Sequence, residues 1–207
     1  MLSKEDIITL DKSQIKAAGE VLGRALQDDP VSIYDIPDKE KRHAVMKHVF
    51  QMTSCLGVKY GETHATSPNL EGIAVWLPYI NKEFKMILNI ACLLKAKVYK
   101  MGSQASKRIK PIEEYNTEVH REFTPGDHWY LQTLGVEPVH QGKGYGTMLM
   151  EYMLEKIEKT NPLPVFLETS TEVNVKFYKR FRFEVVSEGI IPETDVEQWH
   201  LLRNVKQ

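Results

Sequence analysis

The sequence predicts a single mixed α/β domain over residues 1–207, and three observations support this. Two stretches with the apolar spacing of amphipathic helices come first, and a pair of short strand-like segments follows them. The second half then gives the order strand, helix, strand, helix, strand, which favours a mixed central sheet flanked by helices. A chain of 207 residues that is 42% hydrophobic can bury a substantial core without disulfides or metals.

The two N-terminal helices are expected over residues 15–27 and 38–55. Asp11 and Gln14 have the spacing of a capping box, and apolar residues then recur at helical intervals. We expect Asp29-Pro30 to end the first helix, because proline disfavours the helical conformation in the residue before it. Residues 58–66 and 72–77 predict two strands around a turn at 67–69.

Residues 80–123 predict a helical insertion between two strands of the sheet. An apolar stripe with helical spacing is formed by Phe84, Ile87, Leu88, Ala91, Leu94 and Val98. Residues 109–123 are charged and predict a partly helical segment. Two interpretations stay open: an extra pair of packed helices, or a wall of a binding pocket, because insertions often line binding sites.

A glycine-rich segment is the most informative motif of the chain. Residues 129–136 predict a strand, which leads into Gln141–Gly146 and then into an amphipathic helix over about residues 145–159. Glycines lack the Cβ atoms that keep a ligand away from the backbone. The free N–H groups and positive dipole end at the start of the helix, with Lys143 beside them, favour a bound phosphate group.

This segment does not match the two common nucleotide-binding motifs. A P-loop requires Ser or Thr after Gly-Lys, whereas Gly144 follows Lys143, and Glu137 stands where that motif has its first glycine. A dinucleotide fingerprint requires a third glycine, at a position that Thr147 or Leu149 occupies here. The remaining pattern is Gln-x-x-Gly-x-Gly after a strand.

That pattern and the residues after it resemble the GCN5-related N-acetyltransferase (GNAT) family. The loop resembles the family's coenzyme A pyrophosphate loop, and a buried strand, a helix and a further strand follow it. The second half also resembles the puromycin N-acetyltransferase type, over about residues 128–204. The segments that carry this resemblance are Trp129-Tyr130-Leu131, Gly135-Val136, His140–Gly144, Phe166–Ser170 and Phe177-Tyr178. Upstream it is limited to Asp29-Pro30 and Ala74–Pro78.

The resemblance implies the GNAT acyltransferase fold, acetyl-CoA as the acyl donor and no metal. It assigns backbone groups of the strand to the pantetheine arm and the glycine loop to the pyrophosphate. It assigns Asn174 and Phe177 to further cofactor contacts. The cofactor-binding residues implied are Leu134, Gly135, Val136, Gln141, Gly142, Lys143, Gly144, Tyr145, Gly146, Thr147, Asn174 and Phe177. Asn174 is alternatively only an N-terminal helix residue.

Two side chains are candidates for the proton transfers of acetyl transfer. Tyr178 is the candidate general acid, because a phenol stays protonated at neutral pH. Glu168 ends a buried strand, where a carboxylate is costly unless it is paired, and is a candidate base for the substrate ammonium. The alternatives are an aromatic that packs on its helix and a structural carboxylate. Asp29 and Trp76 are candidates for substrate binding, although Asp29 is alternatively a helix-end residue.

Composition argues against several other classes of function. With 27 basic and 28 acidic residues, no general charge favours nucleic acid or a membrane surface. No apolar stretch is long enough to span a membrane, and the N-terminus does not resemble a signal peptide. Cys55 and Cys92 predict no disulfide framework and fit a reducing, cytoplasmic setting. The histidines show no metal-ligand spacing, and no serine has the setting of a hydrolase nucleophile.

The sequence therefore predicts an acetyl-CoA-dependent N-acetyltransferase that acts on a primary amine of a small molecule, with an aromatic or otherwise apolar body. Acetylation of a protein N-terminus or lysine is one alternative, and a non-catalytic acyl-CoA-binding module is another. In one place the chain departs from the family. Arg182 stands where the family usually has a glycine with positive φ, so the turn after the Tyr178 helix is expected to be strained or built differently.

Overall fold

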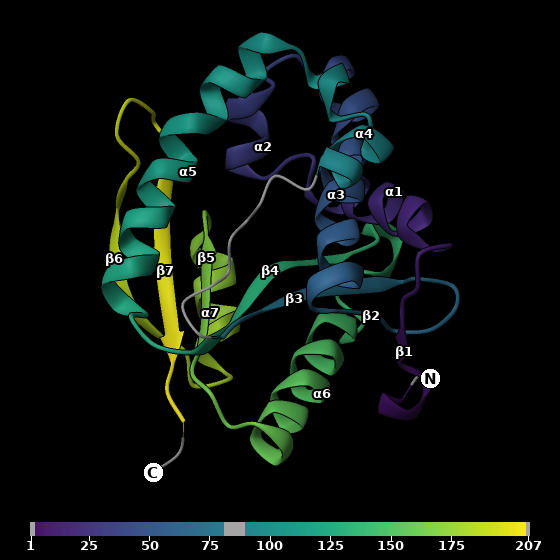
Figure 1. Cartoon of the computed structure of the whole chain (residues 1–207), viewed down its shortest axis with the longest axis vertical. Helices are drawn as coiled ribbons and strands as arrows, with labels where there is room; N and C mark the ends of the chain where they lie inside the picture. Colours follow the sequence, from purple (N-terminus) through teal and green to yellow (C-terminus); the bar gives the residue numbers. More distant parts are fainter. Residues whose placement is uncertain (1–2, 81–89, 206–207) are drawn as a thin grey trace.

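A seven-stranded mixed sheet with helices on both faces forms the computed structural model, which describes residues 3–80 and 90–205 (Figure 1). The strand order is β1-β2-β3-β4-β5-β7-β6, and all neighbours are antiparallel except β4 and β5. The strands are β1 (Ile8–Thr9), β2 (Glu62–Ala65), β3 (Gly72–Tyr79), β4 (His128–Val136), β5 (Val165–Thr169), β6 (Glu184–Ile190) and β7 (Glu197–Arg203). The helices are α1 (Ile15–Leu26), α2 (Pro30–Asp35), α3 (Lys39–Tyr60), α4 (Ile90–Ala96), α5 (Ser103–Phe123), α6 (Tyr145–Thr160) and α7 (Glu172–Lys179). The predicted mixed α/β class is confirmed.

The two faces of β3 are buried under different helices. Ile73 and Val75 pack against α1, whereas Ala74 and Trp76 pack against α6 on the opposite face. This follows from the period of two in a strand, which turns successive side chains to opposite faces. Because both faces are covered, β3 is apolar throughout instead of alternating.

The N-terminal elements agree with the predicted order but differ at their ends. Asp38 caps α3 by accepting a hydrogen bond from the Lys41 amide, and α3 continues to Tyr60, where Gly61 ends it. The strand predicted to begin at residue 58 therefore begins at Glu62. Pro30 follows the end of α1 and is also the first residue of α2. Asp29 is the N-cap of α2. Proline is well suited to that position, where no helical N–H partner is needed.

The central strands β4 and β5 diverge. They pair only at Trp129–Val165 and Tyr130–Phe166, and beyond this point no β4–β5 pairing continues. On the other side of β4, Thr133 pairs with Val75 and Leu131 with Trp76, so Gln132 is an extra residue in a β-bulge. β4 therefore has a bulge on its β3 side, and the divergence from β5 leaves its other edge without a strand partner after Tyr130.

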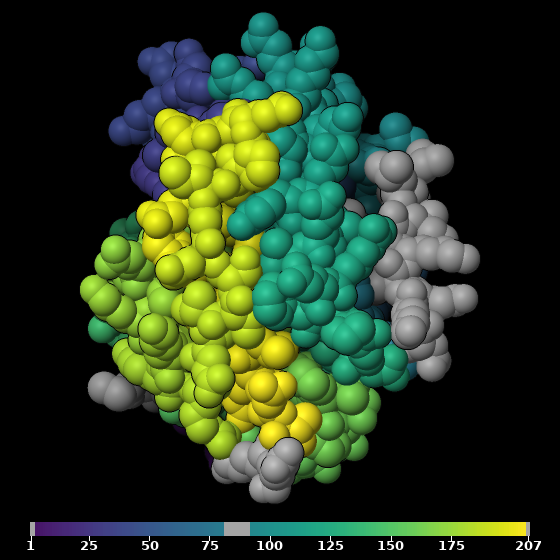
Figure 2. Space-filling model, turned by 90° about the vertical axis from the view of Figure 1, so that its left-hand side faces the viewer, coloured from purple at the N-terminus to yellow at the C-terminus, as the bar shows by residue number. Residues whose placement is uncertain are grey.

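The predicted insertion contains α4, a 3₁₀ segment at Val98–Met101 and the long helix α5. Figure 2 shows α5 in teal lying along the β6–β7 hairpin in yellow, where Ile112 packs with Ile191 and Val196. The apolar stripe predicted for the first helix is wrong at Leu94, which is 65% exposed, whereas Cys92 and Ala96 face the interior. Phe84, Ile87 and Leu88 lie outside the described residues.

A disulfide joins Cys55 of α3 to Cys92 of α4, with the two Cα atoms 5.9 Å apart. This corrects the prediction of two unlinked cysteines. The two cysteines are 37 positions apart, and the sequence between them gave no indication that α4 returns to pack on α3. The cross-link fixes the start of the insertion against the helical layer that covers β3.

Candidate active site

The glycine loop holds a left-handed backbone at the start of α6. Gly142 and Gly144 have φ values of +75° and +86°, and Gly144 is the N-cap of α6 with no side chain capping the helix. A Cβ atom on either glycine would meet no protein atom within 4 Å, so the space in front of the loop is open. Gln141 braces the loop by donating a hydrogen bond to the carbonyl of Val136, 3.1 Å away. An anion placed here would meet unpaired N–H groups and the positive end of the helix dipole.

A cleft of about 740 Å³ runs from this loop along the end of β4 to α7. All of the predicted cofactor residues except Lys143 line it. They are Leu134, Gly135, Val136, Gln141, Gly142, Gly144, Tyr145, Gly146, Thr147, Asn174 and Phe177. The ammonium of Lys143 instead donates to the carbonyl of Val139, at 3.0 Å.

Arg180 supplies the cleft with a cation that the motif did not indicate. Its guanidinium donates to the Thr147 hydroxyl at 3.0 Å and lies 5.3 Å from the centroid of the Phe177 ring. The side chain comes from the end of α7, more than thirty residues after the loop, so only the tertiary structure brings the two together. Arg180 lines the same cleft as the glycine loop.

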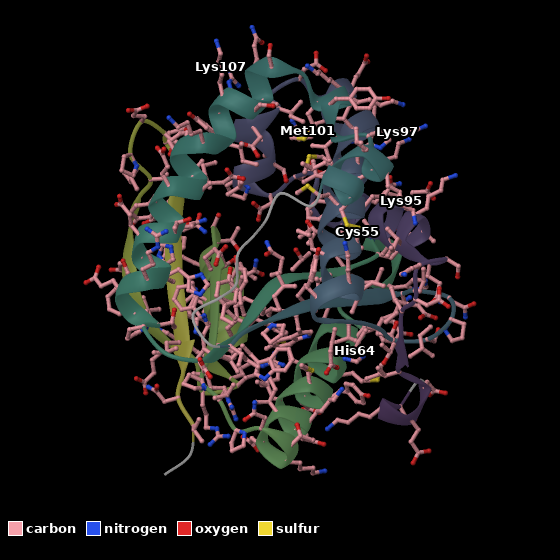
Figure 3. All side chains as sticks on the ribbon, in the orientation of Figure 1. Cys55, His64, Lys95, Lys97, Met101 and Lys107 are labelled. Atoms are coloured by element: carbon pink, nitrogen blue, oxygen red, sulfur yellow. A yellow bond between two sulfur atoms is a disulfide. The ribbon has the colours of Figure 1, made fainter. Side chains whose placement is uncertain are left out.

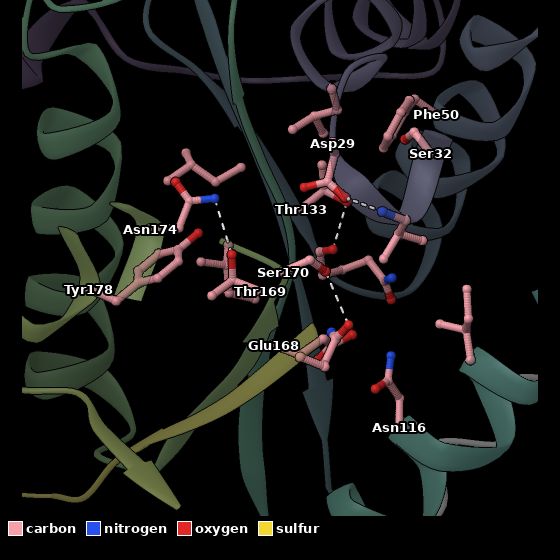
Figure 4. Close-up of a pocket in the computed structure, with 17 residues that line it drawn as sticks. Asp29, Ser32, Phe50, Asn116, Thr133, Glu168, Thr169, Ser170, Asn174 and Tyr178 are labelled. Atoms are coloured by element: carbon pink, nitrogen blue, oxygen red, sulfur yellow. Dashed lines mark hydrogen bonds between the residues drawn. The ribbon is translucent and has the colours of Figure 1, made fainter. Parts of the chain in front are cut away.

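A second, smaller cavity of about 200 Å³ opens between β4, β5, α2 and α5 (Figure 4). Its lining mixes polar and apolar side chains, and the polar ones include Ser32, Asn116, Thr133, Glu168, Ser170 and Gln198. Asn116 and Ile112 come from α5, so the insertion does form one wall of this pocket. Tyr115, also from α5, lies outside the pocket and packs with Ile112 and Ile191.

The cleft and the pocket meet where β4 and β5 diverge. The residues that line both are Leu26, Asp29, Leu134, Asn174 and Tyr178. A molecule in the cleft and a second one in the pocket would therefore approach each other at this junction.

Glu168 lies at the end of β5 and lines the pocket. The hydroxyl of Tyr130 donates a hydrogen bond to its Oε1. Burial raises the pKa of the Glu168 carboxyl to about 7, and the hydrogen bond from Tyr130 opposes part of that rise. The carboxyl can therefore exchange a proton near neutral pH, which suits a general base.

Tyr178 and Asn174 project from α7 toward the junction (Figure 4). The Asn174 amide donates to the Thr169 hydroxyl at 3.1 Å, while its backbone lies in the first turn of α7. The pKa of the Tyr178 phenol is raised by burial and by the charge of Glu168, so the phenol keeps its proton. Its hydroxyl makes no hydrogen bond to another described side chain, and so it can donate to a ligand.

The two predicted substrate-binding residues lie in different environments. Asp29 lines both the cleft and the pocket, and one carboxylate oxygen accepts from the Val31 amide at 3.0 Å as the N-cap of α2. Burial raises the pKa of Asp29. Trp76 is fully buried under α6 and lines neither cavity. Because its side chain lies on the α6 face of β3, Trp76 occupies a core position and not a substrate-binding one.

The histidines near the pocket are held neutral by burial. His128 donates from Nδ1 to the carbonyl of Gly126, and its Nε2 lies 2.6 Å from Nε2 of His120. Burial lowers the pKa of both rings, and that of His120 falls to about 3. Among residues 3–80 and 90–205 no group of three or more His, Cys, Asp or Glu side chains is arranged to hold a metal ion.

Within the same described ranges, every helix is too short or too polar to cross a membrane.

Comparison with known proteins identifies relatives of both sequence and fold. Residues 108–183 match the model of the acetyltransferase (GNAT) family. An uncharacterised N-acetyltransferase of Schizosaccharomyces pombe is 26% identical over 183 residues, which cover 84% of this chain and 72% of the yeast protein. This match and the family match rest on sequence, independently of the fold.

Two solved structures share the fold over nearly their whole length. A protein of Corynebacterium glutamicum, described as histone acetyltransferase HPA2 and related acetyltransferase, has a TM-score of 0.68 and 16% identity, covering 100% of this chain and 98% of its own. Arylalkylamine N-acetyltransferase 2 of Aedes aegypti has a TM-score of 0.62 and 11% identity, covering 97% and 98%. At these identities the likeness establishes the fold.

Proposed function

Because the chain is an N-acetyltransferase of the GNAT family, we propose that it transfers the acetyl group of acetyl-CoA to a primary amine of a small molecule. The observation that carries this proposal is the junction between the cleft and the pocket at Leu134, Asn174 and Tyr178. A thioester that enters along β4 and an amine in the pocket would meet there in a geometry suited to direct attack.

The residues of the cleft fit coenzyme A. The open space before Gly142 and Gly144 admits a pyrophosphate to the N-terminus of α6, and Arg180 adds a positive charge. The edge of β4 that β5 leaves unpaired offers backbone groups to the pantetheine amides. When bound, acetyl-CoA supplies the activated acetyl thioester.

Glu168 and Tyr178 would handle the protons. Glu168 takes a proton from the acceptor ammonium, directly or through water, and so releases the amine lone pair. The amine nitrogen forms a bond to the carbonyl carbon, and the bond from that carbon to sulfur breaks. Tyr178 would donate its proton to the leaving thiolate, and the surplus proton on the new amide nitrogen would return the Tyr178 phenolate to a phenol, directly or through water. A backbone N–H of the β4 bulge region would stabilise the transient oxyanion.

The pocket favours a short and polar acceptor. Its volume of about 200 Å³ is below the ~300–1,000 Å³ of pockets for drug-sized ligands. Half-buried carboxylates at Glu168 and Asp29 suit a cationic ligand. We therefore replace the expected aromatic or apolar body with a compact, polar amine. The small volume of the pocket also favours a small molecule over a peptide lysine or N-terminus. Tyr178 at the junction and Glu168 in the pocket favour catalysis over mere acyl-CoA binding.

The test is a panel of acceptors with acetyl-CoA, read by release of the free thiol. The panel contains short diamines and amino alcohols, arylalkylamines, puromycin, and lysine and N-terminal peptides at matched concentration. We expect turnover on the short polar amines, which Glu168→Gln lowers at least a hundredfold. Turnover on peptides alone would refute the small-molecule acceptor, and thiol release from no acceptor would refute catalysis on these classes.

A further inference from the structure

A third cavity lies apart from the active site, between α1, α3, α4 and the 3₁₀ segment that follows α4. It has a volume of about 740 Å³ and shares no lining residue with the cofactor cleft or the acceptor pocket. Figure 3 labels Cys55, Lys95 and Lys97 on this side of the molecule. We call it the lysine cleft, because six lysines line it: Lys12, Lys16, Lys47, Lys95, Lys97 and Lys100.

The charge of the lysine cleft is concentrated and unneutralised. Glu20 is the one carboxylate among the described residues that line it, although the chain as a whole has a net charge of −1. Within the described parts of the chain, none of the six lysines forms an ion pair. Clustered cations in a concave surface raise the local concentration of anions.

Two further features of the lining suit a bound anion. The side chain of His48 is only 7% exposed, and its Nδ1 has no hydrogen-bond partner among the described residues. Burial and the charges of Lys100 and Lys47 lower the pKa of this ring, so an anion nearby would let it take up a proton. Lys97 has a left-handed backbone with φ of +57°, which is unfavourable for a non-glycine residue and often marks functional positions.

The lining also indicates what kind of anion fits. A ligand with a single carboxylate could not neutralise six ammonium groups, whereas one with several phosphates could. Lysine binds a phosphate group as a point charge. Among residues 3–80 and 90–205, the lining contains no Phe, Tyr or Trp, so these residues offer no ring on which a nucleobase could stack. We propose that the lysine cleft binds a small, non-aromatic molecule that carries several phosphate groups.

Titration calorimetry of the whole protein tests this, with inositol hexakisphosphate and tripolyphosphate as probes. Saturating acetyl-CoA is present to occupy the cofactor cleft. We expect micromolar binding that weakens with salt, and about tenfold or greater loss in Lys47→Ala/Lys100→Ala. The matched control, Lys107→Ala/Lys159→Ala, removes two exposed lysines outside the cleft and should change affinity less than twofold.

A second readout is the pKa of His48, followed by the NMR shift of its ring with and without tripolyphosphate. It should rise on binding in the wild type and stay unchanged in the double cleft variant. The proposal is overturned if neither probe binds below 1 mM, if both double variants lose affinity equally, or if the His48 pKa does not move. Tighter binding of single-stranded DNA or anionic vesicles than of the probes, lost in the cleft variant, would also overturn it in favour of a macromolecular partner.

Discussion

The hydroxyl of Tyr130 donates a hydrogen bond to the Glu168 carboxylate at the point where β4 and β5 separate. Tyr130 and Phe166 are the last paired residues of the two strands. Because Phe166 lies two residues before Glu168, this pairing brings the Tyr130 phenol close to the carboxylate. Burial raises the pKa of Glu168 to about 7, whereas the hydrogen bond stabilises its ionised form. Tyr130 therefore lowers the pH above which Glu168 is ionised and can act as a base, although burial remains the larger influence.

Tyr130→Phe is expected to move the pH dependence of kcat/KM to higher pH. As a base, Glu168 must be ionised, so activity rises with pH through its pKa near 7. Loss of one hydrogen bond to the carboxylate raises that pKa. The rising limb of the kcat/KM profile should therefore move to higher pH by about one unit. Pre-steady-state or initial-rate profiles from pH 5 to 9 measure this.

The acceptor amine also titrates, but its pKa is the same for both enzymes, so the difference between their profiles isolates Glu168. Tyr152→Phe, which removes a hydroxyl at a distance from Glu168 in α6, should leave the profile unchanged. An unshifted limb in Tyr130→Phe would show that Glu168 is not the titrating base.

Acetyl-CoA is expected to stabilise the wild type but not Gly144→Val. Ligand at a hundred times its dissociation constant adds about 2.7 kcal/mol to the free energy of unfolding. A valine at residue 144 would be forced to a φ of +86° and would project into the open space before the loop. Thermal melts with acetyl-CoA, CoA and ATP measure the effect.

Gly126→Val is the matched control, because a side chain at residue 126 also meets open space but without a positive φ. It should retain the full thermal shift. Equal shifts with ATP and acetyl-CoA in the wild type would contradict a cleft specific for coenzyme A.

Tyr178→Phe is expected to lower kcat about a hundredfold or more and to change acetyl-CoA affinity little. The ring stays packed among Phe177 and Phe183, and only the hydroxyl at the junction is lost. Single-turnover rates and calorimetric affinities separate the two effects. Tyr152→Phe serves again as control, and near wild-type turnover in Tyr178→Phe would assign this tyrosine to packing alone.

Arg180→Ala is expected to weaken acetyl-CoA about tenfold or more, because a charge-assisted contact to phosphate is lost. The comparison substrate is the acetyl thioester of N-acetylcysteamine, which carries no phosphate. Its kcat/KM should be the same in the variant and in the wild type, and Arg121→Ala, on the exposed surface of α5, should affect neither donor. A parallel loss with both donors would show that Arg180 acts on the fold and not on the phosphates.

The grouping of the predicted cofactor residues in one cleft could be predicted because its signals are local. The glycine loop, the strand before it and the helix after it are adjacent in sequence, so residues 134–147 could be assigned to one surface. Pro30 was read only as the end of a helix, although proline also suits a first helical position, and α2 was missed. The last strand, β7, was not predicted separately.

The acceptor half depends on contacts between distant segments. Asn116 reaches the pocket from α5, and Arg180 reaches the loop from the end of α7. The Cys55–Cys92 disulfide likewise depends on how α4 packs on α3. Trp76 lies in an apolar strand that is covered on both faces. The sequence pattern of such a strand does not show which face Trp76 points to, or whether it borders a cavity.

Arg182 has a φ of +66°, in the left-handed conformation that the missing family glycine would adopt without strain. This conformation costs a non-glycine residue roughly 1–2 kcal/mol. The side chain offsets part of that cost, since its guanidinium donates to Glu158 at 3.0 Å. Such half-exposed ion pairs contribute about 0–1 kcal/mol. The turn therefore has the positive φ that the resemblance to the GNAT family implies, with strain in place of the glycine.

Arg182→Gly should consequently be at least as stable as the wild type, whereas Arg182→Ala loses the ion pair and keeps the strain. We expect the Gly variant to exceed the Ala variant by about 1 kcal/mol in the free energy of unfolding, measured by urea denaturation. The same pair of substitutions at Lys107, in the helical backbone of α5, should give the opposite order, because glycine is about 1 kcal/mol worse than alanine there. If Ala were the more stable replacement at both positions, the left-handed turn at Arg182 would be refuted.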